Sequence, residues 1–238
     1  NDVNNINEGS EERRRFIDSI ISQTDRVYLD ELIAYNHCLA NRNALLRQVA
    51  SSGRYDAGLL EIYDEQLVGL GTQIFAKRKA FMQIFTPLFY KHYAYITDDQ
   101  EEVELVYDSL LYTHDFATLL TGIHKDDLLF SIVGMPLKKF GSQGQQKSFL
   151  IALKLAQYTF LTQQKGFKPL LLLDDIFDKL DECRIQKLMQ MVSDKDFGQL
   201  CITDTNRVRI EKIFEEIGVP IQVFDIAKGE VISSATAV

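Results

Sequence analysis

The sequence predicts an α/β protein with a helical domain, in which an antiparallel helical hairpin precedes a mostly parallel sheet flanked by helices. Three observations predict this fold class. The first half of the chain carries apolar residues at helical spacing and has no proline before Pro87. The second half alternates short apolar runs with amphipathic segments, the order of a sheet covered by helices. Apolar residues make up 46% of the 238 residues, enough for a substantial core.

Two long helices are expected in the first half. One runs from about Asp25 to Ala50 with Thr24 as its N-cap, and the other runs from about Asp56 to Phe85 or beyond. Both carry apolar stripes at steps of three and four, and a short turn joins them, so we expect an antiparallel hairpin. Ordinary helix packing is the simpler interpretation, and a coiled-coil docking arm is the alternative. The stripes are Leu29, Leu32, Asn36, Leu39, Asn43 and Leu46, and Leu60, Tyr63, Leu67, Leu70, Ile74, Phe81, Ile84 and Leu88.

The second half is expected to alternate strands and helices. Strands are expected at residues 103–107, 128–133, 170–173, 200–203 and 221–224. Helices are expected from the glycine-containing loop at residues 141–144 to about residue 164, and at about residues 181–192 and 208–217. An acidic cluster near residues 98–101 marks a boundary. We therefore expect a helical arm domain at residues 1–98 and a second domain at residues 99–238.

Composition excludes several classes of protein. The net charge of −8 argues against a protein that coats nucleic acid through bulk charge, although a local basic patch is compatible with it. Cys38, Cys183 and Cys201 are widely spaced, so we expect free buried thiols in a reducing, cytoplasmic compartment. No apolar run approaches the ~20 residues that span a bilayer, so no membrane partner is expected. The chain begins with Asn1, which we interpret as a fragment whose natural N-terminus lies upstream.

An aliphatic run that ends in two acids carries the first chemical signal. Residues 170–173 are four leucines, followed by Asp174 and Asp175. They predict a buried parallel strand with two carboxylates at its C-terminal edge, where open α/β sheets bind their ligands. Asp174 is suited to hold Mg²⁺ through oxygen, and Asp175 to orient a water molecule. This is the Walker B pattern, which is weak evidence on its own because many strands end in two acids.

The second signal is the segment GSQGQQK at residues 141–147, which opens a long amphipathic helix. Glycine lets the backbone approach a ligand closely, and the free N–H groups of a helix end favour an anion. The segment resembles the signature motif of ABC-type ATPases, with Ser142, Gly144 and Gln145 in register and Gln143 in place of a glycine. A helix that is merely capped by Ser142 is the structural alternative.

The third signal is the segment FDKLD at residues 177–181. In ABC-type ATPases a loop that ends in Leu-Asp at this place, the D-loop, contacts the partner subunit. Asp181 matches that aspartate, and it fits the N-cap of the next helix equally well. The order of signature motif, helix, Walker B strand and D-loop is more specific than any one part.

The amino-acid sequences of four segments narrow the resemblance to the RecF family of bacterial recombinational repair. The segment GSQGQQK is followed by ALKLA at residues 152–156, and the other segments are GSEERRRFID at 9–18, NRNALL at 41–46 and HKDDL at 124–128. The matches run from near the start of the chain to about Thr205 in the order of the family. The resemblance therefore covers almost the whole chain.

The resemblance implies part of an ABC-type P-loop ATPase head, interrupted by a helical arm, that dimerises head to head around ATP. It implies a protein of DNA repair, replication, recombination and the SOS response that binds double-stranded DNA at gaps. It also implies that RecO and RecR act with the protein to load recombinase. The implied site has Asp174 on Mg²⁺ and Asp175 as the catalytic residue. The implied contacts to ATP on the other subunit are Ser142, Gln143, Gly144 and Gln145.

The sequence departs from the ABC-type pattern in three ways. No G-x-x-x-x-G-K-[ST] occurs in the chain, so this chain alone is expected neither to bind ATP tightly nor to hydrolyse it. Asp175 stands where most ABC-type proteins have a longer glutamate, which implies slow turnover. Asp204 or Thr205 takes the place of a switch histidine as the γ-phosphate sensor, and hydroxyl residues at this place are typical of the RecF family.

Two further features have competing interpretations. Arg13, Arg14 and Arg15 are candidates for contact with DNA phosphate, although a solvated face or an ion-pair cluster is the simpler interpretation. His124 lies in a turn between a helix and a strand, and we expect it to have a structural hydrogen bond rather than a catalytic role.

The leading hypothesis is an ATP-switched DNA-repair clamp with slow, DNA-stimulated ATPase activity. The first alternative is an ABC-like scaffold or protein-interaction module without significant turnover, suggested by Asp175 and the missing switch histidine. The second is the head of an SMC-type protein or of an overcoming-lysogenisation-type nuclease. The helical arm is too short for the SMC-type protein.

Overall fold

The computed structural model describes residues 9–52, 57–114, 122–174 and 176–237. The chain packs as two compact units, which are residues 1–90 with 102–141, and residues 91–101 with 142–238. These units do not follow the expected boundary at residue 98, because one uninterrupted helix continues from the first unit into the second. The division into an arm at residues 1–98 and a head part at residues 99–238 concerns function rather than packing, and it stays a prediction.

Three helices build most of the first unit. They are α2 (Ser10–Thr24), α3 (Arg26–Ser52) and α4 (Ala57–Thr97), and α4 continues into the second unit. The expected N-cap at Thr24 is wrong. The Asp25 carboxylate accepts a hydrogen bond from the Tyr28 N–H at 2.8 Å, while the Thr24 hydroxyl donates to the Ile21 carbonyl. Because α3 begins at Arg26, Asp25 stands at the N-cap position and reaches the Tyr28 amide, and this hydrogen bond lowers the pKa of Asp25.

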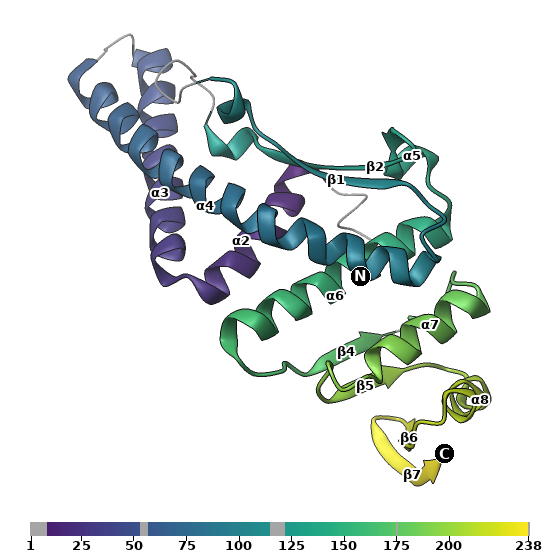
Figure 1. Cartoon of the computed structure of the whole chain (residues 1–238). Helices are drawn as coiled ribbons and strands as arrows, with labels where there is room; N and C mark the ends of the chain where they lie inside the picture. Colours follow the sequence, from purple (N-terminus) through teal and green to yellow (C-terminus); the bar gives the residue numbers. More distant parts are fainter. Residues whose placement is uncertain (1–8, 53–56, 115–121, 175, 238) are drawn as a thin grey trace. The chain divides into compact units, whose positions relative to one another are not determined.

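Helices α3 and α4 form the expected antiparallel hairpin (Figure 1). Lys77 on α4 pairs with Glu31 near the start of α3 at 3.0 Å, whereas Arg42 near the end of α3 pairs with Asp64 near the start of α4. As residue numbers rise along α3, the numbers of their partners on α4 fall, so the two helices run antiparallel.

The expected apolar stripes are only partly buried. Asn36 and Asn43 are exposed, and Ile84 is 46% exposed. On α4 the stripe residues Leu67, Ile74 and Phe81 are buried as expected, but beyond Phe81 the buried side passes to Phe85 and Phe89. The reason is that a straight α-helix has 3.6 residues per turn, so a stripe read at a 3.5-residue period drifts off the buried face.

A small antiparallel sheet completes the first unit. Its strands are β1 (Val103–Asp108), β2 (Asp127–Ile132) and β3 (Met135–Pro136), in the order β1-β2-β3. Alternate residues of β1 are buried, as expected from its sequence. The Tyr90 hydroxyl on α4 accepts a hydrogen bond from the Leu105 N–H at 3.2 Å and joins this strand to the helix. The short helices of this unit are η1 (Leu110–Tyr112), η3 (Ile123–Lys125) and α5 (Leu137–Phe140).

A buried arginine links the elements of the first unit. Arg78 on α4 is 2% exposed, and its guanidinium donates two hydrogen bonds to Asp18 on α2, at 3.0 and 2.9 Å. It also donates to Asp126 and to the carbonyl of Ile123, both at 3.0 Å. Since a buried charge is tolerated only when it is paired and hydrogen-bonded, this cluster fixes how α2, α4 and the start of β2 pack together.

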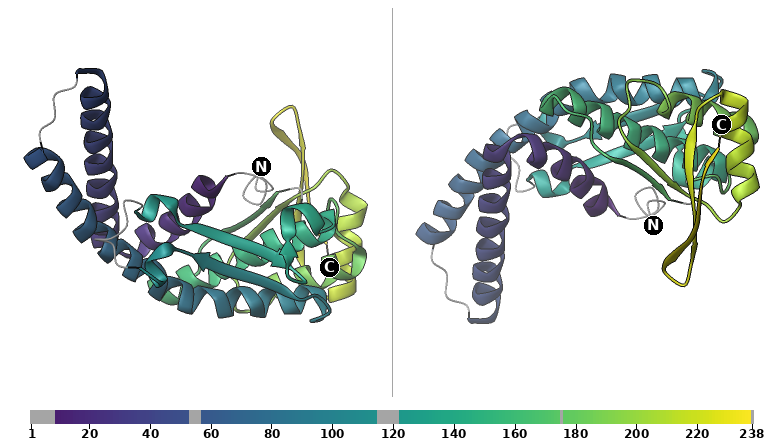
Figure 2. Two further views of the ribbon diagram at one scale, coloured as in Figure 1. Left: turned by 90° about the horizontal axis from the view of Figure 1, so that it is seen from above. Right: turned by 90° about the horizontal axis from the view of Figure 1, so that it is seen from below.

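The second unit alternates helices and strands. Its elements are α6 (Gln143–Lys165), β4 (Leu171–Asp174), α7 (Glu182–Val192), β5 (Leu200–Thr203), α8 (Arg207–Ile217), β6 (Ile221–Ala227) and β7 (Glu230–Ala237). Strands β4 and β5 pair in parallel, with Asp174 opposite Thr203. Strands β6 and β7 form an antiparallel ribbon (Figure 2).

The expectation of a mostly parallel sheet holds only for β4 and β5. The other two described sheets are antiparallel, because β1 pairs with β2 and β6 turns directly into β7. Lys228 and Gly229 form that turn with φ values of 52° and 83°, the left-handed conformation that tight hairpins require.

Two expectations about burial are also corrected. Leu171 and Leu173 are buried, but Leu172 between them is 66% exposed, so β4 is covered on one face rather than on both. Among the cysteines only Cys38 is buried, while Cys183 and Cys201 are exposed.

Candidate functional site

The start of α6 has the geometry of an anion-binding helix end. The Ser142 hydroxyl oxygen accepts a hydrogen bond from the Gln145 N–H at 3.2 Å, and the Gln145 side-chain oxygen accepts one from the Ser142 N–H at 2.8 Å. This reciprocal capping box uses the Ser142 oxygen as an acceptor, so the hydroxyl proton can still be donated to a ligand. The N–H groups of Gln143 and Gly144 point out of the helix end, where the helix dipole also favours negative charge.

Gly144 brings the start of α6 against the segment expected to be the D-loop. A Cβ atom built on Gly144 would lie 3.3 Å from the Lys179 carbonyl oxygen, closer than nine in ten such contacts. Lys179 has a φ of 67°, an uncommon left-handed conformation for a residue with a side chain. The expected signature motif and the expected D-loop are therefore in direct backbone contact.

Asp181 caps the next helix. Its carboxylate accepts a hydrogen bond from the Arg184 N–H at 2.9 Å and pairs with the Arg184 guanidinium at 3.0 Å. The structure thus shows the N-cap that the sequence allowed for Asp181, and contact with a partner subunit stays a prediction.

Two charged residues that the sequence did not single out complete this site. The Arg184 guanidinium donates to Glu101 at 2.7 Å and to the buried Ser148 hydroxyl on α6 at 2.9 Å. Glu101 also accepts hydrogen bonds from Gln145 at 3.2 Å and from Tyr93 at 2.5 Å. Burial opposes ionisation of Glu101, but the hydrogen bonds from Tyr93, Arg184 and Gln145 outweigh it and lower its pKa. In the sequence, the available signal for Arg184 was its position three residues after Asp181, where the two side chains can pair on a helix.

Asp174 lies at the C-terminal end of β4, as expected. Its exposed carboxylate accepts a hydrogen bond from the Thr203 hydroxyl on the adjacent strand. Among the described residues, no group of three or more His, Cys, Asp or Glu side chains could hold a metal ion. The oxygens of Asp174 and Thr203 fit Mg²⁺ as part of a coordination shell that phosphate and water would complete. Asp175, the expected catalytic residue, lies outside the described residues.

The expected sensor residues follow β5. Asp204 accepts a hydrogen bond from the Asn206 N–H at 2.6 Å, and Asn206 in turn caps α8 by accepting from the Arg209 N–H at 3.1 Å. Thr205 between them is exposed. The Arg209 side chain donates to the Phe177 carbonyl at 2.8 Å and so joins the start of α8 to the segment after β4.

The three arginines proposed for DNA contact have partners within the first unit. Arg13 forms two hydrogen bonds to Asp127, at 2.8 and 2.7 Å, and Arg14 donates to the Asp126 carbonyl at 2.7 Å. Arg15 is 65% exposed and pairs with Glu11 and Glu12, both at 2.6 Å. These contacts are those of an ion-pair cluster, and contact with DNA stays a prediction.

His124 has the structural hydrogen bond that we expected. Its Nδ1 atom lies 3.0 Å from the Tyr35 hydroxyl on α3. Burial, followed by the nearby charges of Lys125, Arg14 and Arg42, lowers its pKa, so the imidazole is held neutral.

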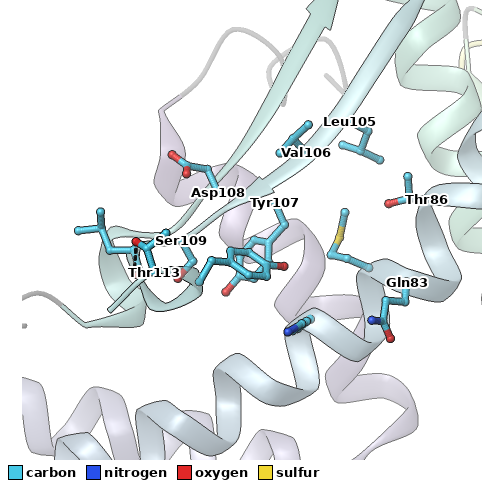
Figure 3. Close-up of a pocket in the computed structure, with 12 residues that line it drawn as sticks. Gln83, Thr86, Leu105, Val106, Tyr107, Asp108, Ser109 and Thr113 are labelled. Atoms are coloured by element: carbon cyan, nitrogen blue, oxygen red, sulfur yellow. Dashed lines mark hydrogen bonds between the residues drawn. The ribbon is translucent and has the colours of Figure 1, made fainter. Parts of the chain in front are cut away.

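A hollow of about 650 Å³ lies in the first unit between α4 and β1 (Figure 3). None of the expected site residues that the structure describes lines it. Figure 3 shows Gln83 and Thr86 on the helix across from Leu105 and Tyr107 on the strand.

Comparison with known proteins identifies the family. No family model matches the chain. The DNA replication and repair protein RecF of Flavobacterium johnsoniae is 50% identical over 235 residues, which cover 93% of this chain and 66% of that protein. The RecF of Phocaeicola vulgatus is 43% identical over 238 residues, which cover 94% of this chain and 63% of that protein. The chain belongs to the RecF family.

Solved structures agree with this assignment. A structure of the recombination mediator protein RecF-ATPrS in the RecFOR pathway superimposes with a TM-score of 0.72 and 27% identity, and the match covers 87% of this chain and 61% of that chain. The Smc head domain of Pyrococcus furiosus superimposes with a TM-score of 0.58 at 13% identity, which shows a shared fold. The chain spans about 63–66% of the length of the two RecF relatives. None of the helices in the described part of the chain is long and apolar enough to cross a membrane.

Proposed function

We propose that the RecF protein to which this chain belongs binds DNA in an ATP-dependent manner as a head-to-head dimer. In this role it assists the RecO and RecR mediators in loading recombinase at gaps in double-stranded DNA. The observation that carries the proposal is the start of α6, where Ser142 closes a capping box and Gly144 lies against the Lys179 carbonyl. The capping box leaves the first two N–H groups of the helix without an intrahelical partner. Such a helix end suits the terminal phosphate of a nucleotide held by another subunit.

Each candidate site residue has its own role in this proposal. Ser142, Gln143, Gly144 and Gln145 contact the γ-phosphate of ATP on the other subunit. Asp174, oriented by Thr203, holds Mg²⁺. Mg²⁺ supplies charge neutralisation between the phosphates when it is bound. Asp175 orients the attacking water, Asp181 faces the partner subunit, and Asp204 or Thr205 senses the γ-phosphate. Arg13, Arg14 and Arg15 are retained as the candidate DNA contacts, with the exposed Arg15 as the first to test.

The 238 residues contain no G-x-x-x-x-G-K-[ST], so the proposal requires that the loop binding ATP in the same subunit come from outside them. The test is ATP hydrolysis by the full-length protein, with and without double-stranded DNA. We expect slow turnover that DNA stimulates and that the Asp175→Asn variant loses. A second measurement is dimerisation with ATP, which Ser142→Arg should abolish because its bulk and charge fill the helix end.

The alternative proposal is an ABC-like scaffold without significant turnover. The specific observation behind it is the short acid Asp175 together with Asp204 and Thr205 where a switch histidine is common. Absence of hydrolysis under every condition, with dimerisation that ignores ATP, would establish the scaffold and overturn the clamp.

A further inference from the structure

The Glu101 carboxylate is shared by three donors. One of its oxygens accepts from Gln145 at 3.2 Å and from Arg184 at 2.7 Å, and the other accepts from the Tyr93 hydroxyl at 2.5 Å. The side chain of Glu101 is 14% exposed. Charge-assisted hydrogen bonds are the stronger kind, and partial burial protects them from water. Glu101 is therefore a fixed acceptor beside the start of α6.

The orientation of the Gln145 amide depends on this acceptor. Its oxygen faces the Ser142 N–H, and its nitrogen faces Glu101. If the amide flipped, its NH₂ group would meet the Ser142 N–H, donor against donor, and its oxygen would meet a carboxylate. Glu101 thus favours the one orientation in which the capping box closes on Ser142.

Arg184 ties three segments to the same point. Its guanidinium donates to Glu101 and to Ser148 on α6 at 2.9 Å, and it forms an ion pair with Asp181 at 3.0 Å. Ser148 is fully buried and lies one helical turn after Gly144, the residue in contact with the Lys179 carbonyl. The planar guanidinium has five N–H donors in a rigid fork, so it can serve all three partners at once, which an ammonium group on a flexible stem does less well.

We infer that Glu101 and Arg184 are positioning residues, which hold Ser142 and the turn at residues 179–181 as one rigid surface for the nucleotide of the opposing subunit. The inference deepens the proposed function and rests on it. Neither residue touches the nucleotide, and each acts through the capping box of Ser142 or the cap at Asp181.

The first test measures ATP-dependent dimerisation of the full-length protein by sedimentation. Arg184→Lys keeps the charge and loses the fork, and Glu101→Gln keeps the size and loses the charge. Each should weaken the dimer about tenfold, within the range of coupling between neighbouring residues. Binding of a fluorescent ATP analogue to separate subunits should not change. The matched control is Arg207→Lys, whose arginine pairs with Glu211 and Asp225 on the surface of the same unit, and it should behave as wild type.

The second test is a double-mutant cycle with Ser142→Ala. If Arg184 acts through Ser142, then Arg184→Lys should weaken the dimer much less in the Ser142→Ala background than in the wild type. Full additivity of the two losses would overturn the inference, as would an unchanged dimer affinity in Arg184→Lys and Glu101→Gln.

The third test separates this inference from the proposed function. Hydrogen exchange of the peptide that contains residues 142–147, measured on the full-length protein without nucleotide, should speed up several-fold in Arg184→Lys and stay unchanged in Arg207→Lys. A wild-type protein that does not dimerise with ATP would overturn the proposed function alone. Unchanged exchange in Arg184→Lys would overturn the positioning role whatever the dimer does.

Discussion

Each unit of this chain contains an arginine held between two carboxylates, and the two arginines differ in what surrounds them. Arg78 in the first unit is 2% exposed and lies between Asp18 and Asp126. Arg184 in the second unit is 18% exposed and lies between Glu101 and Asp181. Arg78 joins elements of a core, whereas Arg184 joins the ends of two helices that carry the candidate site. The same chemistry therefore stabilises architecture where it is enclosed and shapes a binding surface where it borders solvent.

The largest expected effect is at the enclosed cluster. Arg78→Met leaves Asp18 and Asp126 buried without their cation, so we expect a loss of about 3–5 kcal/mol in the free energy of unfolding. The same substitution at Arg184 should cost only about 1–2 kcal/mol, because water can solvate the 59% exposed Asp181 and Glu101 keeps its hydrogen bonds from Tyr93 and Gln145. Urea unfolding measures both values.

The exposed Arg26, which pairs with Asp30 at 3.2 Å on the surface of α3, provides the control for these two variants. Arg26→Met should change the unfolding free energy by less than about 0.5 kcal/mol. Equal losses for Arg78→Met and Arg184→Met would remove the distinction between the two clusters.

Alkaline pH should weaken both clusters through their phenols. Burial raises the pKa of Tyr28 and Tyr107, which bond to the carboxylates around Arg78, and of Tyr93, which bonds to Glu101. A raised folded-state pKa contributes stability that is fully present below the unfolded value of about 10 and is lost as the pH rises through the folded value. Phenolate absorbance should therefore show these tyrosines titrating only as the protein unfolds. Their ionisation in the folded protein near pH ~10 would contradict the enclosed geometry.

Two glycines give a smaller and more local comparison. Gly69 lies within α4, and a Cβ atom there would meet nothing within 4 Å, so Gly69→Ala should stabilise the protein by about 0.5–1 kcal/mol. Gly144→Ala should not, because its Cβ atom would press on the Lys179 carbonyl. Thermal unfolding of the two variants tests the contact between Gly144 and Lys179. An equal gain in stability at both positions would mean that the turn at Lys179 moves aside at little energetic cost.

The smallest expected effect is on the acid side. The lowered pKa of Glu101 means that its contribution to stability is present above the unfolded value of about 4.3 and is lost as the pH falls through the folded value. Burial raises the pKa of Asp126, so that residue contributes in the opposite sense. The stability difference between wild type and Glu101→Gln should therefore shrink below pH ~4. Glu182→Gln, at an exposed acid of the same unit, controls for the lost charge.

The sequence predicted the elements whose signals are local. The long helices follow from their spacing, the cap at Ser142 from its residue type, and the order of α6, β4 and Asp181 from the motifs. Asn36 and Asn43 were wrongly expected on the apolar stripe of α3. A stripe read at a 3.5-residue period rotates away from the buried side of a 3.6-residue helix over several turns. Strand β7 was not predicted, because its serines and alanines give only a weak alternation of apolar and polar residues. The signal that could have revealed it was Gly229, which forms the turn before this strand.

Glu101 could not be predicted from local pattern. It belongs to an acidic cluster that reads as a boundary, and its partners Gln145 and Arg184 lie 44 and 83 residues later. Only the tertiary structure brings these three side chains together, and no spacing rule applies to such distances. The same holds for Thr203, whose bond to Asp174 depends on the register between β4 and β5.

These separations also set an order of assembly. The caps at Ser142 and Asp181 each close over three residues, whereas the contacts of Arg184 with Ser148 and Glu101 close loops of 36 and 83 residues. Closing a longer loop costs more chain entropy, so the caps should form early in folding and the link to Glu101 late. A chain in which α6 and α7 have already formed would then still lack the competent surface, and the protein would become able to engage a partner only at the last step of folding.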